Sequence, residues 1–229
     1  MHDSSANAGV CGILTTVPLF PLPNVVLFPR AVLPLHIFEE RYKSMTADAL
    51  AGRKLIAMAL LKPGWEKSYY CRPPIESVVC VGKIISCERL PDGKYNFLLQ
   101  GQSRATIVTE HDSHTPYRIS DLQPLSEPPV MEIDLSNQRL RLTSIFSDDV
   151  FSAASLGRQF LQMLSSPLST TDIADLIAFN LFDSPCLKQK LLAEVDVHRR
   201  VQRVIDALEA LRPGLESVKT KRCSTLRRN

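Results

Sequence analysis

The chain is 229 residues long, and 22% of its residues are charged while 45% are hydrophobic. This composition excludes a fibrous or disordered protein, and the length suits one large domain or two modest ones. The formal net charge of +3 is concentrated at one end, because Ser217–Asn229 holds five basic residues and no acidic residue, so that the rest of the chain sums to −2. The body of the protein is therefore not expected to bind nucleic acid through its charge.

Cysteine spacing and apolar run lengths point to the cytoplasm. The six cysteines are widely separated and form no C-x-x-C pair, and the N-terminal residues lack a charged segment followed by a long apolar one. The apolar run at 55–61 has seven residues, well short of the roughly 18 that a membrane-spanning helix needs. We expect a cytoplasmic protein with free thiols and no membrane association.

The first third of the chain has the features of a β-rich domain. Residues 1–15 are small and polar and predict a disordered leader. The next stretch carries five prolines among Val, Leu and Phe, which excludes one continuous helix and favours short extended pieces. We expect these pieces at Val17–Phe20, Val25–Phe28 and Val32–Ile37. From Glu39 apolar residues recur at helical spacing until Gly52, which predicts a helix with a glycine C-cap.

Further strands are predicted up to residue 125. The apolar run Leu55–Leu61 predicts a strand buried on both faces, although its periodicity alone does not distinguish it from a helical turn. Asp92-Gly93 predicts a hairpin turn. The remaining strands are expected at Val78–Glu88, Tyr95–Gln100, Arg104–Thr109 and Tyr117–Leu125. About seven short strands and one helix favour a small mixed barrel.

The rest of the chain changes from strand to helix. Residues 126–130 contain Pro128-Pro129 and predict a proline linker. Apolar stripes at helical spacing follow at 173–181 and 187–195, and Ser184-Pro185 supplies a cap and a first-turn proline for the second of these. With one or two further helices within 131–164, we expect an antiparallel helical bundle over 131–212.

The last apolar stripe predicts the clearest helix of the chain. It begins after Asp196, a suitable N-cap, and apolar residues recur from Val197 to Leu211. Pro213-Gly214 is expected to stop this helix. Residues 213–229 are then predicted to form a basic, disordered tail rather than a nucleic-acid-binding arm, because five charges give only weak, salt-sensitive attachment.

Catalytic and metal-binding motifs are absent from the sequence. Neither Gly82-Lys83 nor Gly93-Lys94 belongs to a phosphate-binding G-x-x-x-x-G-K-[ST] loop, and the segment around Ser103 lacks the second glycine of a nucleophile elbow. The group His111-Asp112-Ser113-His114 does not have the ligand spacing of a structural zinc site and predicts a solvated turn. His36 is expected to make an orienting hydrogen bond at the start of the helix. We predict no enzymatic activity and no catalytic, cofactor-binding or metal-binding residue.

The loop 62–76 is the best local sign of a binding surface. It carries the single tryptophan, Trp65, and two tyrosines, Tyr69 and Tyr70, beside two lysines. Such a mixture stacks on bases or grips extended peptides. The alternative is that these aromatic side chains form a lid over the end of the barrel.

Several motifs resemble the N-terminal substrate-binding domain of Lon proteases. The opening segment Pro18–Pro29 and the following Leu33–Tyr42, which contains His-Ile-Phe-Glu-Glu-Arg-Tyr, carry the most specific likeness and look most similar to the stand-alone members. Further matches are Val81–Ile84, Glu88–Asn96 and Leu99–Arg104, and the helical segments 173–178 and 188–196 are also similar. The resemblance covers about residues 16–212.

The resemblance implies an α+β protein with a PUA-like β-barrel domain and one helix over 16–125, followed by a C-terminal helical bundle. It also implies a module that binds unfolded or exposed polypeptide segments, with an ATP-dependent protease as a candidate partner. This module is expected to be non-catalytic, because the ATPase and Ser-Lys peptidase regions of full Lon proteases have no counterpart here. RNA binding by a PUA-like protein is the alternative function. From local chemistry the candidate protein-binding residues are Trp65, Tyr69, Tyr70, Glu40 and Arg41.

Overall fold

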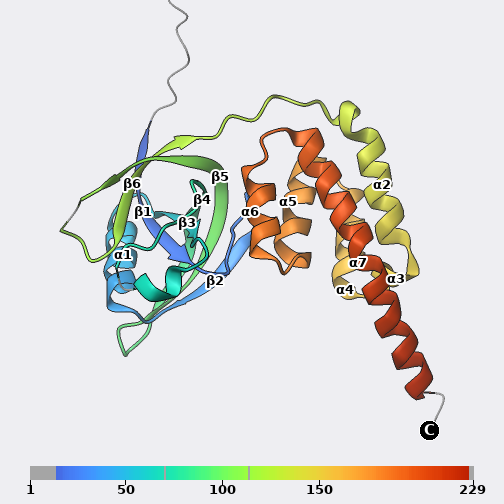
Figure 1. The fold of residues 1–229 in the computed structure, drawn as a ribbon, viewed down its shortest axis with the longest axis horizontal. Helices are drawn as coiled ribbons and strands as arrows, with labels where there is room; N and C mark the ends of the chain where they lie inside the picture. Colours follow the sequence, from blue (N-terminus) through green and yellow to red (C-terminus); the bar gives the residue numbers. More distant parts are fainter. Residues whose placement is uncertain (1–13, 70, 113, 227–229) are drawn as a thin grey trace, which may run out of the picture. The chain divides into compact units, whose positions relative to one another are not determined.

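The computed structural model describes residues 14–226 except 70 and 113, and for residues 214–226 it describes the backbone alone. The chain forms two compact units. The first comprises Met1–Val25 and Leu33–Leu125, and the second comprises Val26–Val32 and Ser126–Asn229. The first unit contains the strands and one helix, and the second contains the remaining helices (Figure 1). The α+β class predicted from the sequence is confirmed.

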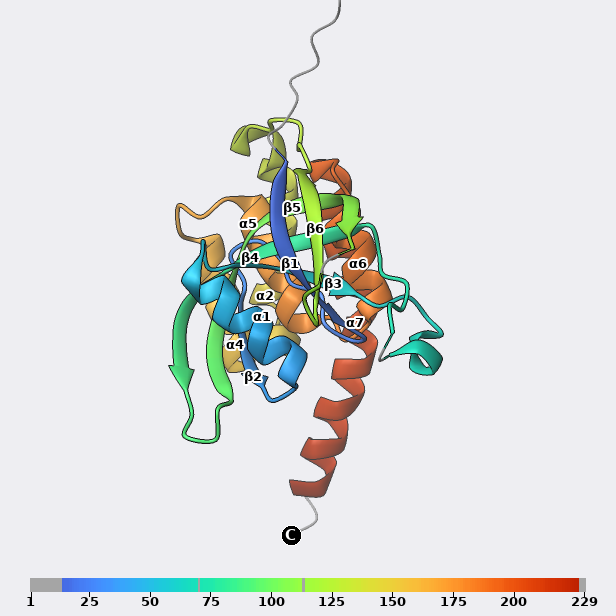
Figure 2. The same ribbon diagram turned by 90° about the vertical axis from the view of Figure 1, so that its left-hand side faces the viewer.

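The first unit is built on a six-stranded sheet whose order is β2-β5-β4-β3-β1-β6. The strands are β1 (Thr15–Leu22), β2 (Val32–Ile37), β3 (Leu55–Leu60), β4 (Val78–Arg89), β5 (Tyr95–His111) and β6 (Arg118–Pro124). Strand β1 pairs with β3 in parallel and with β6 in antiparallel orientation, and Figure 2 shows β1 and β6 side by side. Because β6 also pairs with β5, five of the strands pair in a closed cycle.

The core of this unit follows from the alternation of side chains along the strands. Buried residues from five strands form one cluster, namely Val17, Leu19, Ala57, Ala59, Val79, Val81, Ala105 and Leu122. Strand β3 is buried along nearly its whole length, as predicted. Helix α1 (Glu40–Ala51) buries Tyr42, Met45 and Ala49 at helical spacing. It ends at Gly52, whose backbone N–H donates to the carbonyls of Asp48 and Ala49, so the predicted C-cap is confirmed.

The predicted strand Val25–Phe28 is wrong. This segment is irregular, and its residues Val26, Leu27 and Phe28 belong to the helical unit, where they are buried. Pro23 and Pro29 flank it and cannot donate to a strand ladder, whereas burial of three large apolar side chains stabilises the segment strongly. Arg30 follows with a φ of 63° and forms an ion pair with Asp172 at 2.6 Å.

Two predicted strands, Tyr95–Gln100 and Arg104–Thr109, are one continuous strand. Strand β5 passes through the intervening residues with a β-bulge, because Val81 lies opposite Ser103 and Gly82 lies opposite Gly101. The bulge leaves Gln102 unpaired and keeps the strand extended. Gly82 permits close packing here, since a Cβ atom at this position would lie 2.6 Å from Cγ of Leu99.

The second unit contains one 3-10 turn and six helices within the described residues. They are η2 (Glu132–Leu135), α2 (Ser136–Ser147), α3 (Asp149–Ser152), α4 (Ser155–Leu164), α5 (Thr170–Leu181), α6 (Pro185–Ala193) and α7 (Val197–Leu226). The predicted caps are confirmed: Ser184 accepts from the N–H of Leu187, and Asp196 accepts from the N–H of Arg199. The segment 131–164 holds more helices than expected, because Asp148 ends α2 and caps the short α3.

Helix α7 does not stop at Pro213-Gly214 as predicted, and its backbone stays helical as far as Leu226. Residues 213–226 of the predicted disordered tail are therefore helical, while residues 227–229 and the leader residues 1–13 lie outside the described residues. Pro213 lacks the N–H that would bond to the carbonyl of Glu209. It does not prevent later residues from resuming helical hydrogen bonds.

Candidate functional site

A pocket of about 320 Å³ lies in the first unit. It is framed by the end of β1, the start of α1, the loop after β3 and the segment that precedes β6. Tyrosines, prolines and arginines dominate its lining, which comprises Pro21, Arg41, Tyr42, Leu61, Tyr69, Cys71, Arg72, Pro73, Thr115, Pro116, Tyr117 and Arg118. We call it the aromatic pocket. Flat rings and prolines offer apolar contact area, and hydroxyl and guanidinium groups offer hydrogen bonds.

One wall of the aromatic pocket is organised by Glu39, the residue before α1. Its carboxylate accepts from Nε of Arg41 at 3.0 Å and from the hydroxyl of Tyr69 at 2.9 Å. Arg41 also donates to the backbone carbonyl of Tyr69, at 3.3 Å. The guanidinium of Arg41 lies over the rings of Tyr42 and Tyr69, 4.5 Å and 4.8 Å from the ring centroids. These contacts fix Tyr69 against α1, although it comes from a loop about 30 residues further along the chain.

Trp65 extends this wall outward. It begins the short 3-10 turn η1 (Trp65–Ser68) after Gly64, whose φ of 88° is readily adopted only by glycine. The indole meets the ring of Tyr69 edge to face, with 5.4 Å between centroids. Trp65 and Tyr69 are both half-buried. Tyr69 lines the pocket and Trp65 packs on Tyr69 without lining it, so the pair presents aromatic surface beside the pocket.

The opposite wall is held by a second arginine. Arg118 donates twice to the carboxylate of Glu110, at 2.8 Å and 2.6 Å, and once to the carbonyl of Pro73, at 2.7 Å. Tyr117 donates to Asp48 of α1 at 2.6 Å. These bonds anchor the end of the loop and the start of β6 to neighbouring elements, so this wall is pre-formed.

Burial raises the pKa of all three pocket tyrosines. For Tyr69 the hydrogen bond to Glu39 adds to the effect of burial, and for Tyr117 the hydrogen bond to Asp48 does the same. The phenol groups therefore stay protonated at neutral pH, and those of Tyr69 and Tyr117 donate their single protons to Glu39 and Asp48. Their oxygens can still accept hydrogen bonds, which suits recognition of N–H groups rather than proton abstraction.

The structure brings three of the five candidate residues together. Arg41 and Tyr69 line the aromatic pocket, and Trp65 packs on Tyr69. Glu40 does not join them, because its side chain is 88% exposed and pairs with Lys43 at 2.5 Å. Tyr70 lies outside the described residues. The binding role of all five stays a prediction.

Sequence reasoning missed most of the pocket. Glu39 directly precedes two of the candidate residues, and an acid beside an arginine and near a tyrosine-rich loop is the signal that would have found it. Tyr117 and Arg118 carry no such local signal, because only the pairing of β6 with β1 and β5 brings them to the pocket. His36 makes a hydrogen bond as predicted, but with Asn96 of β5, at 2.7 Å, rather than at the helix start.

Within the described part of the chain, no group of three or more His, Cys, Asp or Glu side chains is placed to hold a metal ion. Over the same residues, no helix combines the length and apolar character that crossing a bilayer requires.

Comparison with known proteins gives one consistent family. Among curated relatives, Lon protease of Dictyoglomus thermophilum is 28% identical over 82% of this chain, and Lon protease of Desulfosudis oleivorans is 24% identical over 88%. The chain spans about a quarter of the length of these relatives, 23% and 25% respectively.

Solved structures show the same fold. The N-terminal domain of the Mycobacterium avium complex Lon protease matches with a TM-score of 0.67 and 16% identity, over 85% of this chain and 98% of that one. A Lon N-terminal domain protein from Xanthomonas campestris matches with a TM-score of 0.59 and 20% identity, over 84% and 98%. A family model matches residues 16–210, and the chain therefore belongs to the family described as the ATP-dependent protease La (LON) substrate-binding domain.

Proposed function

We propose that this protein is a non-catalytic module that binds unfolded or exposed polypeptide segments, and that the aromatic pocket of the first unit is where they bind. The observation that carries the proposal is the lining of the pocket, in which tyrosines and prolines alternate with arginines on walls held by Glu39 and Glu110. The closed cycle of five strands supports the predicted PUA-like barrel as its scaffold.

The pocket chemistry favours an extended chain over a compact ligand. Aromatic and proline surfaces accept apolar side chains of many shapes, and the phenol oxygens of Tyr69 and Tyr117, whose protons are bonded to Glu39 and Asp48, can accept from backbone N–H groups that an unfolded segment leaves unpaired. Since Arg41 and Arg118 are already paired with carboxylates, they keep the walls in place more than they attract acidic ligands. Binding is then tolerant of sequence and weak for each contact.

The first test is the anisotropy of a labelled, permanently unfolded polypeptide titrated with the protein, and Trp65→Ala is the informative variant. Removing an aromatic anchor costs about 1 to 2 kcal/mol of binding free energy, so affinity falls several-fold while the melting temperature stays nearly unchanged. Glu66→Ala is the matched control, because Glu66 is an exposed residue of the same turn.

Two outcomes would contradict this assignment. If Trp65→Ala lowers the melting temperature markedly and spares binding, Trp65 is a lid and not an anchor. If single-stranded RNA displaces the polypeptide at low salt and fails to do so at high salt, the alternative RNA-binding function is correct.

An ATP-dependent protease is our proposed partner, and the support is that the matched relatives carry this domain as about a quarter of a Lon protease. Degradation of an unfolded client by a full-length Lon protease should accelerate when this protein is added, and Trp65→Ala should reduce the acceleration. An unchanged rate with wild-type protein would remove the protease from the proposal and leave the binding function standing.

A further inference from the structure

The most exposed apolar side chains lie together in the helical unit. Among the described residues, Met131, Ile133 and Leu140 are the three most exposed large hydrophobic residues, at 70%, 71% and 67%. Ile133 and Leu140 line a groove of about 680 Å³ between the η2–α2 segment and the connection from α4 to α5, and Met131 directly precedes η2. We call this the α2 groove. Clustered apolar exposure of this kind marks an interaction surface.

The spacing of the groove residues on one wall is that of a helix-packing seam. Ile133, Ser136, Leu140 and Thr143 line it, at intervals of three, four and three residues along η2 and α2. These intervals bring alternating large and small side chains onto one stripe, which forms the holes that receive the side chains of a second helix. Leu164 and Leu168 contribute to the other wall.

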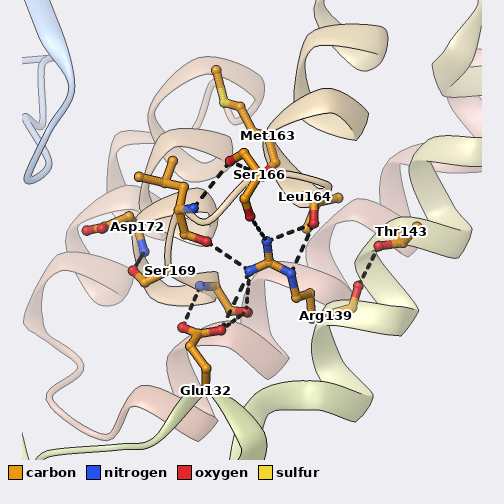
Figure 3. A network of polar contacts seen from close by, with 10 residues as sticks. Glu132, Arg139, Thr143, Met163, Leu164, Ser166, Ser169 and Asp172 are labelled. Atoms are coloured by element: carbon orange, nitrogen blue, oxygen red, sulfur yellow. Dashed lines mark hydrogen bonds and ion pairs between the residues drawn. The ribbon is translucent and has the colours of Figure 1, made fainter.

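The polar groups around the groove are already bonded within the unit. Arg139 of α2 donates to the carbonyls of Leu164, Ser166 and Leu168 and to the hydroxyl of Thr170, as Figure 3 shows. Glu132 accepts from both the backbone N–H and the hydroxyl of Thr170, each at 2.8 Å.

Three of the four hydroxyl groups that line the groove are used in the same way. Those of Thr143, Ser165 and Ser166 donate to backbone carbonyls three or four residues earlier in the chain. The groove therefore has few hydrogen-bonding groups left for an extended chain, whose backbone would be buried without partners. A helix satisfies its own backbone internally, so a helix fits this groove better.

Charge at the rim narrows the choice of helix. Glu132 and Asp134 flank Ile133, and within the described part of the chain no cation lies within ion-pair distance of Asp134. The single arginine of the lining, Arg139, is occupied by the bonds described above. Arg139 also pairs with Glu132 at 3.5 Å, so these two charges offset each other. The exposed carboxylate of Asp134, which directly follows the lining residue Ile133, then leaves a negative charge beside the groove and complements a helix with lysine or arginine beside its apolar stripe.

We propose that the α2 groove docks an amphipathic, basic α-helix of another protein, through apolar residues at heptad spacing and a cation facing Asp134. This surface lies in the second unit and its ligand is helical, so the inference does not rest on the polypeptide-binding role of the aromatic pocket. It assigns the helical unit an interaction of its own with a folded partner.

The test uses the full chain and a synthetic helical peptide of about three heptads, with leucine at the a and d positions and lysine at e and g. Leu140→Glu is expected to weaken binding about tenfold or more, without a change in melting temperature, because the side chain is exposed. Leu211→Glu is the matched control: Leu211 is an exposed apolar residue of the same unit outside the groove, and its variant should bind like wild type. Asp134→Lys should weaken binding of the lysine peptide and strengthen binding of a peptide with glutamate at the e and g positions.

Three results would overturn the proposal. Equal binding by wild type and Leu140→Glu would place the peptide elsewhere. Equal binding of a peptide broken by a central proline would mean that the groove takes extended chains. Absence of peptide binding, together with wild-type self-association in sedimentation equilibrium that Leu140→Glu abolishes, would mean that a second copy of this chain is the occupant.

Discussion

Arg200 gives the sharpest test of how the helical unit is held together. Its side chain is fully buried, and it donates to the carbonyl of Glu194 at 2.6 Å and to the carboxylate of Glu127 at 2.9 Å. Its Nε lies 3.4 Å from the carboxylate of Asp175, which is 2% exposed. Removing one member of a buried ion pair leaves the other charge uncompensated, and this costs about 3 to 5 kcal/mol. Arg200→Met should therefore lower the free energy of unfolding of this unit by that amount.

The measurement is urea unfolding followed by helical circular dichroism, with two companions for Arg200→Met. Arg199→Met is the control, since Arg199 is 73% exposed and its ion pair with Asp196 is long, so the change should stay within about 0.5 kcal/mol. The double variant Arg200→Met/Asp175→Leu should recover part of the loss, because it removes the stranded carboxylate. A loss below about 1 kcal/mol for Arg200→Met, or a double variant less stable than the single one, would refute this reasoning.

Two further changes test the packing and the electrostatics described above. Gly157→Ala should destabilise the helical unit by about 1 to 3 kcal/mol, because the new Cβ would lie 2.0 Å from the carbonyl oxygen of Phe151. Thermal melts would measure this loss, and Gly52→Ala is the control, expected to be nearly neutral because its nearest atom lies 3.5 Å from the new Cβ. The raised pKa values of the pocket tyrosines mean that the unfolded chain loses these protons first, so their contribution to stability is complete below about pH 10 and is lost as the pH rises further. The urea midpoint should therefore fall as the pH rises above about pH 10, and less steeply in Tyr69→Phe; a constant midpoint would contradict this prediction.

Local signals in the sequence predicted the elements that depend on local chemistry. The hairpin at Asp92-Gly93 forms with Gly93 at a φ of 80° and a bond from the N–H of Leu90 to the carbonyl of Lys94. The caps at Gly52 and Ser184 are equally local. The errors have a different origin. Val25–Phe28 has the composition of a strand, but Val26, Leu27 and Phe28 are buried in the helical unit. Strand propensity describes local preference and cannot predict packing against residues about a hundred positions away.

The residues of the aromatic pocket likewise fall into those that local sequence signals indicate and those that only the fold brings together. Trp65, Tyr69 and Arg41 attract attention by residue type and by closeness to one loop. Pro21 and Tyr117 line the same pocket from opposite ends of the first unit's sequence, and strand pairing alone brings them together. Glu40 lies next to Arg41 in the chain but outside the pocket lining, because successive helical residues point in different directions, and its binding role stays a prediction.

The segment Val26–Val32 has a consequence for how the protein is made. The chain enters the helical unit early, leaves it, and returns to it at Ser126. The helical unit therefore needs Leu27 and Phe28 to fill its core, and a fragment starting at residue 126 would leave that space empty. During synthesis about a hundred residues must follow this early segment before the helices that pack on it are made. The residues of the first unit form the loop between the two parts of the helical unit, and packing of Val26–Val32 on the helices closes this loop. The helical unit can therefore complete its core only after the whole first unit has been synthesised.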